Sequence, residues 1–329
     1  MIKVAVVILN YNGEKLLRQF LPSVIQHSTS AEVIVADNGS DDQSLNILES
    51  EFPQIRTIRL NENFGFCKGY NEALKQVDAD IYILLNSDVE VTAGWIRPMT
   101  DLFVSDSYIA AIQPKILSYT HRNKFEYAGA GGGLIDAFGY PFCRGRLFQS
   151  VEDDLGQYND EREVFWASGA CMAIRSLVYH DHGGLDEDFF AHMEEIDLCW
   201  KIQRTKNKVF YTGKSTVYHL GAGTLGYQSP RKTFLNFRNN LTMLLKHYHS
   251  SELLWKIPFR LVLDWIAAGT YVLKGEPRNF LAVLKAHGAL FKIIGSILKK
   301  RKQLRDKYPD YSSANIYSGL ILLKHLFNW

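Results

Sequence analysis

The chain has 329 residues, of which 47% are hydrophobic and 22% are charged, a composition typical of a globular protein with a core of one large or two ordinary domains. Its four cysteines, Cys67, Cys143, Cys171 and Cys199, contain no C-x-x-C pair, which argues against a zinc ribbon or a disulfide scaffold and favours a reducing compartment. The net charge is only +2, but residues 1–230 hold 20 Lys and Arg against 30 Asp and Glu, whereas residues 231–329 hold 17 against 5; such asymmetry suggests a terminal region with its own partner.

The first hundred residues alternate short apolar runs with segments of helical spacing. The first ten residues lack the long apolar core and cleavage site of a signal peptide, so we expect a buried strand there and a cytoplasmic protein. The predicted strands cover residues 4–9, 33–36, 55–60 and 81–85, and the predicted helices cover 14–26, 43–51 and 65–77. Unbroken apolar strands that alternate with helices predict an α/β fold with a mostly parallel central sheet flanked by helices.

Each predicted strand ends in polar residues. These ends are Asn10-Tyr11-Asn12, Asp37-Asn38-Gly39-Ser40, Asn61-Glu62-Asn63 and Asn86-Ser87-Asp88. Ligands bind such sheets at the carboxyl ends of the strands, so we expect a site where these four ends meet.

Residues 101–165 are less regular and contain a glycine-rich run at 129–133 and an acidic patch at 152–154. We expect insertion loops and extra strands around the site there. A strand-like run follows at 163–174, then an acidic helix, and another strand at 209–219.

The acidic helix places three carboxylates in an aromatic and apolar segment, residues 189–200. Helical spacing puts Glu195 on the apolar face with Leu198, Cys199 and Ile202, and puts Glu194 and Asp197 on the opposite face. A carboxylate that points into a partly dry cleft has a raised pKa and can act as a general base. The alternative is that all three acids complement the helix dipole, which accounts for Glu194 and Asp197 better than for Glu195.

Three further residues have both a chemical and a structural interpretation. Asp88, at a strand end, could hold Mg²⁺ or Mn²⁺ against phosphate oxygens, or it could form a turn. Asp37 could accept hydrogen bonds from a nucleotide base or ribose, or it could form an Asx turn. His219 precedes Leu220-Gly221-Ala222-Gly223 and could complete the metal site, or it could be structural.

The usual phosphate-binding glycine loops are absent from the sequence. The turn after the first strand has one glycine, Gly13, rather than G-x-G-x-x-G, and no G-x-x-x-x-G-K-[ST] occurs. Phosphates would therefore be bound by a metal or by cations such as Lys68.

From residue 231 the chain is predicted to be helical and basic. Residues 253–273 are apolar, but Lys256, Pro258, Arg260 and Asp264 interrupt them, so they fail the criterion for a membrane span. Residues 279–307 combine apolar side chains with the run Lys299-Lys300-Arg301-Lys302. Such a basic amphipathic helix suits an anionic membrane surface, or it packs on its own domain or on another subunit.

Seven segments of the sequence together resemble the family 2 inverting glycosyltransferases with the GT-A fold, especially rhamnosyl- and galactofuranosyltransferase-like members. The resemblance covers residues 1–240, with residues 231–329 as a separate C-terminal region. The segments, in family order, are residues 9–12, 37–42, 63–66, 86–88, 168–170, 183–190 and 194–198.

The resemblance implies a role for each matching position. Glu195 would be the catalytic base, Asp88 and His219 the ligands of Mg²⁺ or Mn²⁺, and Asn86 replaces the first acid of the family's Asp-x-Asp motif. The nucleotide would contact Asn10, Asn12, Asp37, Asn63, Gly65, Lys68 and Ser87. The acceptor would contact Glu194, Asp197 and Trp166.

The implied function is transfer of a sugar from a nucleotide-diphosphate sugar to a glycan or polyprenyl-linked acceptor. Two alternatives stay open at this point: a non-catalytic nucleotide-sugar or glycan-binding subunit, and a nucleotidyltransferase on a similar sheet. We expect no nucleic-acid partner, because no nucleic-acid motif accompanies the basic region. The oligomeric state is open, and the protein could lie on the inner face of a membrane through residues 231–329.

Overall fold

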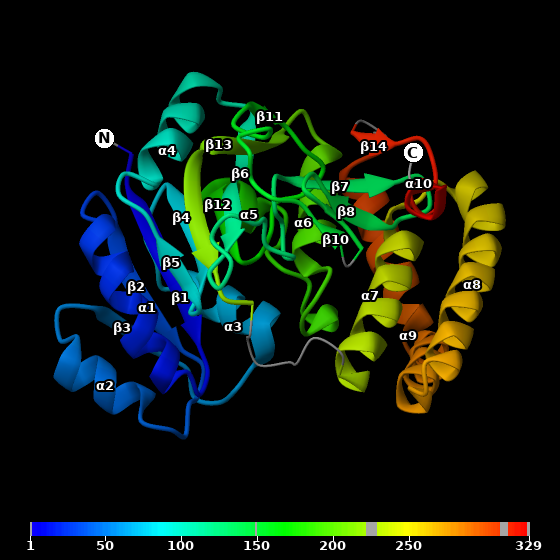
Figure 1. Ribbon diagram of the computed structural model, residues 1–329, viewed down its shortest axis with the longest axis horizontal. Helices are drawn as coiled ribbons and strands as arrows, with labels where there is room; N and C mark the ends of the chain where they lie inside the picture. Colours follow the sequence, from blue (N-terminus) through cyan, green and yellow to red (C-terminus); the bar gives the residue numbers. More distant parts are fainter. Residues whose placement is uncertain (1, 149, 222–228, 310–314, 328–329) are drawn as a thin grey trace.

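The computed structural model describes residues 2–148, 150–221, 229–309 and 315–327, and for residues 325–327 the backbone alone. Its N-terminal part confirms the predicted alternation of strands and helices (Figure 1). The elements are β1 (Val4–Asn10), α1 (Glu14–His27), β2 (Glu32–Asp37), α2 (Ser44–Glu51), β3 (Arg56–Arg59), α3 (Gly65–Leu74) and β4 (Ile81–Asn86).

The register of these strands brings their polar ends to one edge of the sheet. Strand β1 lies between β2 and β4 and is parallel to both. Asn10 lies opposite Asp37, and Leu9 lies opposite Asn86. The apolar residues before these ends are almost fully buried on both faces of the sheet, which explains why the strands read as continuous apolar runs.

The central sheet is larger and more mixed than the sequence suggested. Within the described residues it has nine strands in the order β11-β13-β6-β12-β4-β1-β2-β3, with β5 paired to β13. Strand β12 runs antiparallel to both β4 and β6. The added elements are β5 (Val89–Val91), α4 (Ile96–Ser105), β6 (Ile109–Ser118), β11 (Glu161–Glu163), β12 (Cys171–Arg175) and β13 (Lys208–His219).

Strand β6 lies within residues 101–165, where insertion loops and extra strands were expected. Gln113, Pro114 and Lys115 interrupt its apolar pattern. These polar groups are buried but paired: Gln113 donates to Gly129 O at 2.9 Å, and Lys115 binds Asp154 at 2.7 Å. The single strand expected over residues 163–174 is two strands, β11 and β12, separated by a buried loop.

A second sheet of five strands covers the site region. Its order within the described residues is β10-β9-β8-β7-β14. The strands are β7 (Gly133–Asp136), β8 (Pro141–Cys143), β9 (Arg146–Leu147), β10 (Ser150–Val151) and β14 (Ile316–Tyr317). Strand β14 belongs to the C-terminal region and pairs with β7, so residues 231–329 contribute to this sheet.

The remaining helices pack beyond the second sheet (Figure 1). They follow α5 (Ser176–Asp181), the 3-10 turn η1 (Glu187–Phe189) and α6 (Glu194–Gln203). The C-terminal helices are α7 (Pro230–His247), α8 (Ser250–Leu273), α9 (Pro277–Lys307) and α10 (Ile321–Phe327). Helix α9 packs along α7, and α8 packs against both. The domain boundary predicted at residue 230 falls at the first residue of α7 and stays a prediction.

By length and composition alone, α9 is the one helix among the described residues that could cross a membrane. Its most apolar window of 18 residues has a mean hydropathy of 1.6. This is weak evidence, because core helices of other proteins meet the same criterion.

Candidate active site

Asp37, at the end of β2, is held in place by the neighbouring strand end. Asn10 Nδ2 donates to Asp37 Oδ1 at 3.1 Å, and the Ser40 backbone N–H donates to Asp37 Oδ2 at 3.0 Å. Asn12 connects the same two loops, because its backbone N–H donates to Ser40 Oγ at 2.9 Å and its Oδ1 accepts from Asp41 N–H at 2.9 Å. The structure therefore brings together three of the predicted nucleotide contacts, Asn10, Asn12 and Asp37.

A second amide network connects β2 to the start of α3. Asn38 Nδ2 donates to Asn63 Oδ1 and to Gly65 O, both at 3.1 Å, and Asn63 Oδ1 accepts from Gly65 N–H at 2.9 Å. Lys68, one turn into α3, lies 4.1 Å from the centre of the Phe64 ring. Asn38 is buried and was not among the predicted site residues, although it lies in the polar segment that follows β2.

Asp88 and His219 meet at the next strand end. His219 Nε2 lies 3.1 Å from Asp88 Oδ1, and His219 Nδ1 lies 3.2 Å from Glu126 Oε2. All three side chains are buried. Burial lowers the pKa of His219, but the carboxylates of Glu126 and Asp88 outweigh it and raise the pKa to about 10. Glu126 was not among the predicted site residues, because nothing in its local sequence pattern distinguishes it.

The donor set at Asp88 fits a divalent cation. Asp88 Oδ2 is buried and has no hydrogen-bond partner among the described residues, and an orphaned carboxylate oxygen calls for an explanation such as a metal or a water. A carboxylate and an imidazole are ordinary ligands of Mn²⁺. No group of three or more His, Cys, Asp or Glu within the described part of the chain is arranged to hold a metal alone, so a cation there would need ligands from elsewhere. Ala222 and Gly223, after His219, lie outside the described residues.

The backbone that leads into α6 adopts an unusual conformation. Phe190, His192 and Met193 have positive φ angles of 64°, 69° and 74°, and such a conformation is costly for a residue with a side chain. The Phe190 ring packs on Gly65, where an added Cβ would lie 2.7 Å from the ring. Phe66 N–H donates to Phe190 O at 3.2 Å, so this turn is bound to the start of α3.

Helix α7 holds this turn from the other side. Asn239 Nδ2 lies within hydrogen-bond distance of three backbone carbonyls: Phe189 O at 3.0 Å, Ala191 O at 2.8 Å and His192 O at 2.8 Å. Asn239 is almost fully buried. No local sequence pattern predicts this contact, because it joins residues about fifty positions apart.

Of the three acids in α6, Glu195 is the one whose side chain is partly exposed, whereas Glu194 and Asp197 are buried. Glu195 Oε2 is itself buried and, like Glu194 Oε2, has no hydrogen-bond partner among the described residues. Burial raises the pKa of Glu195 to about 7, so the carboxyl can accept and release a proton near neutral pH.

Gly169 connects Glu195 to the strand ends. An added Cβ at Gly169 would lie 4.0 Å from Glu195 Cβ and 3.5 Å from the Phe66 ring. The next residue, Ala170, accepts a hydrogen bond from Asn86 N–H at 3.0 Å. The base candidate and the Asn86-Ser87-Asp88 strand end are thus separated by one short loop.

The prediction that Glu194 and Asp197 point away from the protein is wrong. Glu194 is 5% exposed and Asp197 is 0% exposed, because α7 covers the face of α6 that was expected to meet solvent. Burial and the charge of Glu195 raise the pKa of Glu194 well above its usual range.

Asp197 is part of a buried network of charges. Its Oδ1 lies 2.7 Å from Lys246 Nζ and 2.9 Å from His247 Nε2, both on α7, and Oδ2 lies 3.8 Å from Lys201 Nζ. Burial would raise the pKa of Asp197, but Lys246, His247 and Lys201 hold it well below its usual range. With no exposed surface, Asp197 has a structural role, and the expected acceptor contact does not fit.

Trp166 also has a place different from the expected one. Its ring packs directly on Gly133, where an added Cβ would lie 2.2 Å from the ring, and its indole N–H donates to Leu134 O at 2.8 Å. The side chain is 4% exposed, so it joins the second sheet to the core and leaves almost no surface for an acceptor.

Comparisons with known proteins agree on one family. The sequence profile described as Glycosyl transferase family 2 matches residues 5–182. The N-acetylglucosaminyl-diphospho-decaprenol L-rhamnosyltransferase of Mycobacterium tuberculosis is 25% identical over 288 residues, which are 82% of this chain and 91% of that protein. The low-salt glycan biosynthesis hexosyltransferase Agl10 of Haloferax volcanii is 24% identical over 240 residues, 71% of this chain and 73% of its own.

Solved structures show the same fold. The crystal structure of GalNAc-T7 with UDP, GalNAc and Mn²⁺ has a TM-score of 0.60 at 16% identity and covers 94% of this chain, which in turn spans 58% of that protein. The mannosyltransferase PcManGT of Pyrobaculum calidifontis, in complex with GDP-Man and Mn²⁺, has a TM-score of 0.52 at 15% identity and covers 99% of this chain and 88% of its own.

Proposed function

Because the chain belongs to glycosyl transferase family 2 and is a glycosyltransferase with the GT-A fold, we propose that it transfers a sugar from a nucleotide-diphosphate donor to a lipid-linked glycan with inversion at the anomeric carbon. The observation that carries the proposal is Glu195. This carboxyl has an unpaired buried oxygen and a pKa near 7, and one loop separates it from the Asp88 strand end.

The donor nucleotide would lie across the ends of β1, β2 and β4. Asp37, held by its hydrogen bond from Asn10, would contact the base, and Asn12, Asn63, Gly65, Lys68 and Ser87 would line the same edge. Ligands of open α/β sheets bind at this edge. Ser87 Oγ lies 3.9 Å from the position of a Cβ added at Gly13, so it adjoins the first turn.

Asp88 and His219 would hold Mg²⁺ or Mn²⁺, with donor phosphate oxygens as further ligands. Such a cation would neutralise the charge that develops on the departing nucleoside diphosphate. Glu126 orients the imidazole of His219 from its other side, at 3.2 Å, as outer carboxylates do for metal-binding histidines.

The transfer would be one displacement. Glu195 Oε2 takes the proton of an acceptor hydroxyl while that oxygen forms a bond to the anomeric carbon. The bond from this carbon to the nucleoside diphosphate breaks at the same time, and the leaving group departs with the electron pair. Burial and the charge of Glu195 raise the pKa of Glu194 well above its usual range, so a proton on Glu194 is favoured while Glu195 is ionised.

A lipid-linked acceptor is proposed by analogy with the mycobacterial relative, whose name states a diphospho-decaprenol acceptor. This would place the reaction in the cytoplasm at the inner face of a membrane. The four cysteines are buried and free, which agrees with a reducing compartment.

The proposal is tested with Glu195→Gln, which keeps the size of the side chain but cannot accept the proton. We expect transfer to fall by about a thousandfold, within the range of general base catalysis, while the Kd for nucleoside diphosphate with Mn²⁺ is unchanged. Asp42→Asn is the matched control, because Asp42 caps the start of α2 through Ser44 N–H at 2.9 Å. Transfer at the wild-type rate by Glu195→Gln would exclude Glu195 as the base.

The products distinguish the alternative functions. A glycosyltransferase releases nucleoside diphosphate, a nucleotidyltransferase releases pyrophosphate, and a binding subunit releases neither from a nucleotide sugar. The family relationship disfavours both alternatives. We expect nucleoside diphosphate in a ratio of one to each sugar transferred.

A further inference from the structure

Helix α8 has its polar and apolar faces reversed. A helix on the surface of a globular protein normally turns its apolar face to the core. In α8 the buried side chains include Lys256, Arg260 and Asp264, at 8%, 5% and 1% exposure. Its large exposed side chains are apolar: Leu254, Trp255, Phe259, Val262, Trp265, Ile266, Val272 and Leu273.

The buried charges of α8 are paired within the protein. Lys256 Nζ lies 2.7 Å from Glu252, and Arg260 Nε lies 2.9 Å from Asp264 and donates to Phe138 O at 3.1 Å. His287 on α9 lies 3.3 Å from Asp264. Because residues 253–273 contain no other charged side chain, the outer face of this helix carries no charge at all.

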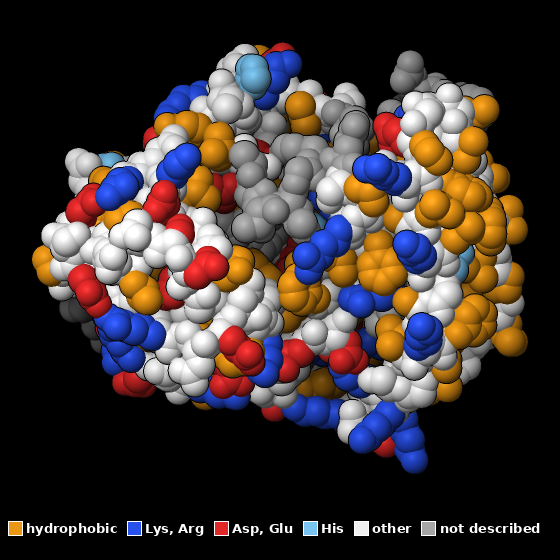
Figure 2. All heavy atoms as spheres, turned by 90° about the horizontal axis from the view of Figure 1, so that it is seen from below, with side chains coloured by type: hydrophobic (Ala, Val, Ile, Leu, Met, Phe, Trp, Pro, Cys, Tyr) orange, Lys and Arg blue, Asp and Glu red, His pale blue; other side chains and the backbone are white. Residues whose placement is uncertain are grey.

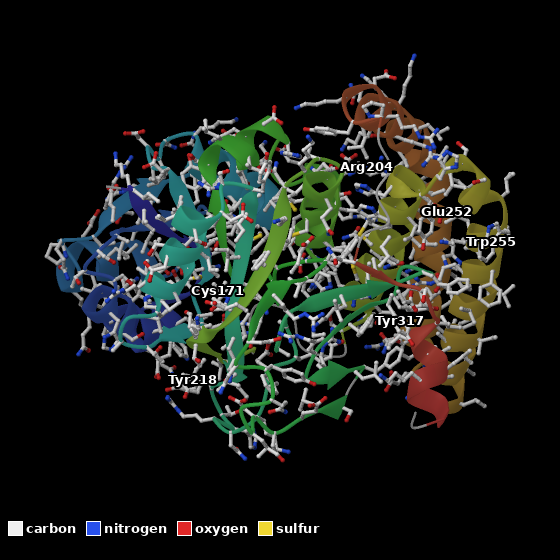
Figure 3. All side chains as sticks on the ribbon, turned by 90° about the horizontal axis from the view of Figure 1, so that it is seen from above. Cys171, Arg204, Tyr218, Glu252, Trp255 and Tyr317 are labelled. Carbon is white, nitrogen blue, oxygen red and sulfur yellow. The ribbon has the colours of Figure 1, made fainter. Side chains whose placement is uncertain are left out.

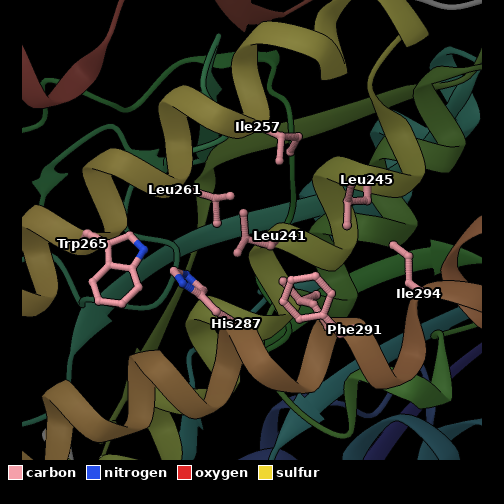
Figure 4. Close-up of a pocket in the computed structure, with 9 residues that line it drawn as sticks. Leu241, Leu245, Ile257, Leu261, Trp265, His287, Phe291 and Ile294 are labelled. Atoms are coloured by element: carbon pink, nitrogen blue, oxygen red, sulfur yellow. The ribbon is translucent and has the colours of Figure 1, made fainter.

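The apolar surface continues from α8 onto α9. Leu281, Phe291, Ile294 and Leu298 are exposed there. A cavity of about 370 Å³ between α7, α8 and α9 opens on this surface, because its lining includes the partly exposed Trp265, Phe291 and Ile294 (Figure 4). Figure 2 shows the hydrophobic side chains gathered over this end of the molecule. Figure 3 shows Trp255 pointing outward from α8.

Exposed cations border this surface. They lie at the end of α8 and along α9 and are Lys274, Arg278, Lys285, Lys292, Lys299 and Lys302. Figure 2 shows Lys and Arg side chains beside the hydrophobic ones. In a symmetric dimer through this face, two such cationic borders would meet and repel. Anionic lipid headgroups would instead be attracted to the cations, and hydrocarbon would cover the apolar side chains.

We propose that the outer face of α8, together with the exposed apolar side chains of α9, binds the surface of an anionic lipid bilayer. Helix α8 lies in the interface over its 24 residues, about 36 Å of helix. Helix α9 stays with the protein, since its buried Arg301 donates to Leu245 O on α7 at 2.7 Å. For the basic helix at residues 279–307, membrane contact and packing within the protein were both left open, and α8 provides the longer uncharged face.

This inference deepens the proposed function, because a lipid-linked acceptor would be presented at the same surface. It does not depend on the transfer chemistry.

The test measures binding of the full chain to anionic vesicles made of phosphatidylcholine with about 30% phosphatidylglycerol. We compare wild type with the double variant Val262→Asp/Ile266→Asp. Both residues are more than half exposed, at 56% and 61%, and neither lines the cavity, so the fold is retained. Partitioning is expected to fall by about a hundredfold, because two apolar side chains that the bilayer would cover become charged.

The matched control is Val104→Asp/Leu177→Asp. These residues are 72% and 83% exposed and belong to α4 and α5, outside the apolar surface of α8 and α9. We expect this variant to bind vesicles like wild type. Tryptophan fluorescence adds a direct readout, because Trp255 and Trp265 are about half exposed, at 54% and 51%, and lipids brominated in their acyl chains should quench them.

Two results would overturn the inference. One is equal binding of wild type and Val262→Asp/Ile266→Asp. The other is a dimer that this double variant dissociates, with no affinity for vesicles. Transfer to a short-chain soluble acceptor separates this inference from the proposed function: a protein that binds vesicles but transfers no sugar contradicts the function alone.

Discussion

At the scale of residues, the environment separates three adjacent acids of α6 into different chemical states. Glu195 has a pKa of about 7, Glu194 a pKa well above its usual range, and Asp197 a pKa well below its usual range. Burial raises all three, and only Asp197 has cations close enough to reverse the effect. Pairs of titratable groups whose pKa values are separated in this way are typical of acid–base sites.

The raised pKa of Glu195 predicts the pH dependence of transfer. A general base works only when it is ionised, so kcat/KM should rise about tenfold per pH unit below pH 7 and level off above it. The measurement is the rate profile between pH 5 and 9 at saturating Mn²⁺. A rate that stays constant from pH 5 to 8 would contradict the assignment, since an ordinary Glu is ionised throughout that range.

At the scale of elements, the turn over residues 189–193 depends on a helix that comes later in the chain. Three residues with positive φ occur within four positions there, and Asn239 binds three of the carbonyls. The turn sets where α6 begins and therefore where Glu195 lies. We assign Asn239 as a positioning residue.

Asn239→Ala should leave these carbonyls without their donor. We expect kcat to fall by about tenfold with an unchanged KM for the donor, and stability to fall by about 1–3 kcal/mol. The control is Asn240→Ala, because the neighbouring side chain is equally buried and donates to Gly139 O at 2.8 Å. It should lose similar stability and keep its kcat. Equal kcat values for the two variants would argue against a positioning role of Asn239.

At the scale of the whole molecule, charges connect the catalytic part to the C-terminal helices. Asp197 on α6 and Asp186 before η1 both bind Lys246 of α7, at 2.7 Å and 2.6 Å. Lys300 of α9 also binds Asp186. These contacts, together with the pairing of β14 and β7, make residues 231–329 a structural support of the site.

Asp197→Asn should be strongly destabilising, because the buried ammonium of Lys246 loses the negative charge of Asp197 that pairs with it. We expect a loss of about 3–5 kcal/mol in the free energy of unfolding, measured by urea denaturation at pH 7. The folded-state pKa of Asp197 is lowered, so its stabilisation is present above the unfolded value of about 3.9 and is lost as the pH falls below it. The difference between wild type and variant should therefore shrink at pH 3. The control is Asp264→Asn, which breaks the buried ion pair with Arg260 inside α8. The transfer rates of the two variants show whether breaking a buried ion pair next to Glu195 lowers activity more than breaking one in α8.

Much of the N-terminal fold could be predicted from local patterns. Strands β1, β2 and β4 are continuous apolar runs that end in polar residues, and this pattern depends only on neighbouring positions. The same pattern singled out Asp37 and Asp88, and helical spacing singled out Glu195. The bounds of strand β6 did not follow from the local pattern, because its buried Gln113 and Lys115 are paired with Gly129 and Asp154 in other segments of the chain.

The sequence alone determined which residues are able to do chemistry, because residue type and spacing along a strand or helix are local properties. The tertiary structure decided which of these residues keep solvent-exposed surface. Glu194, Asp197 and Trp166 were assigned to the acceptor, but Asp197 and Trp166 are enclosed by α7 and by the second sheet, and Glu194 is buried. The tertiary structure also decided that α8 turns its charged side chains inward, because the packing of α7, α8 and α9 brings these charges to their partners. Burial and long-range pairing are set by which segments meet in space, and no local pattern contains that information.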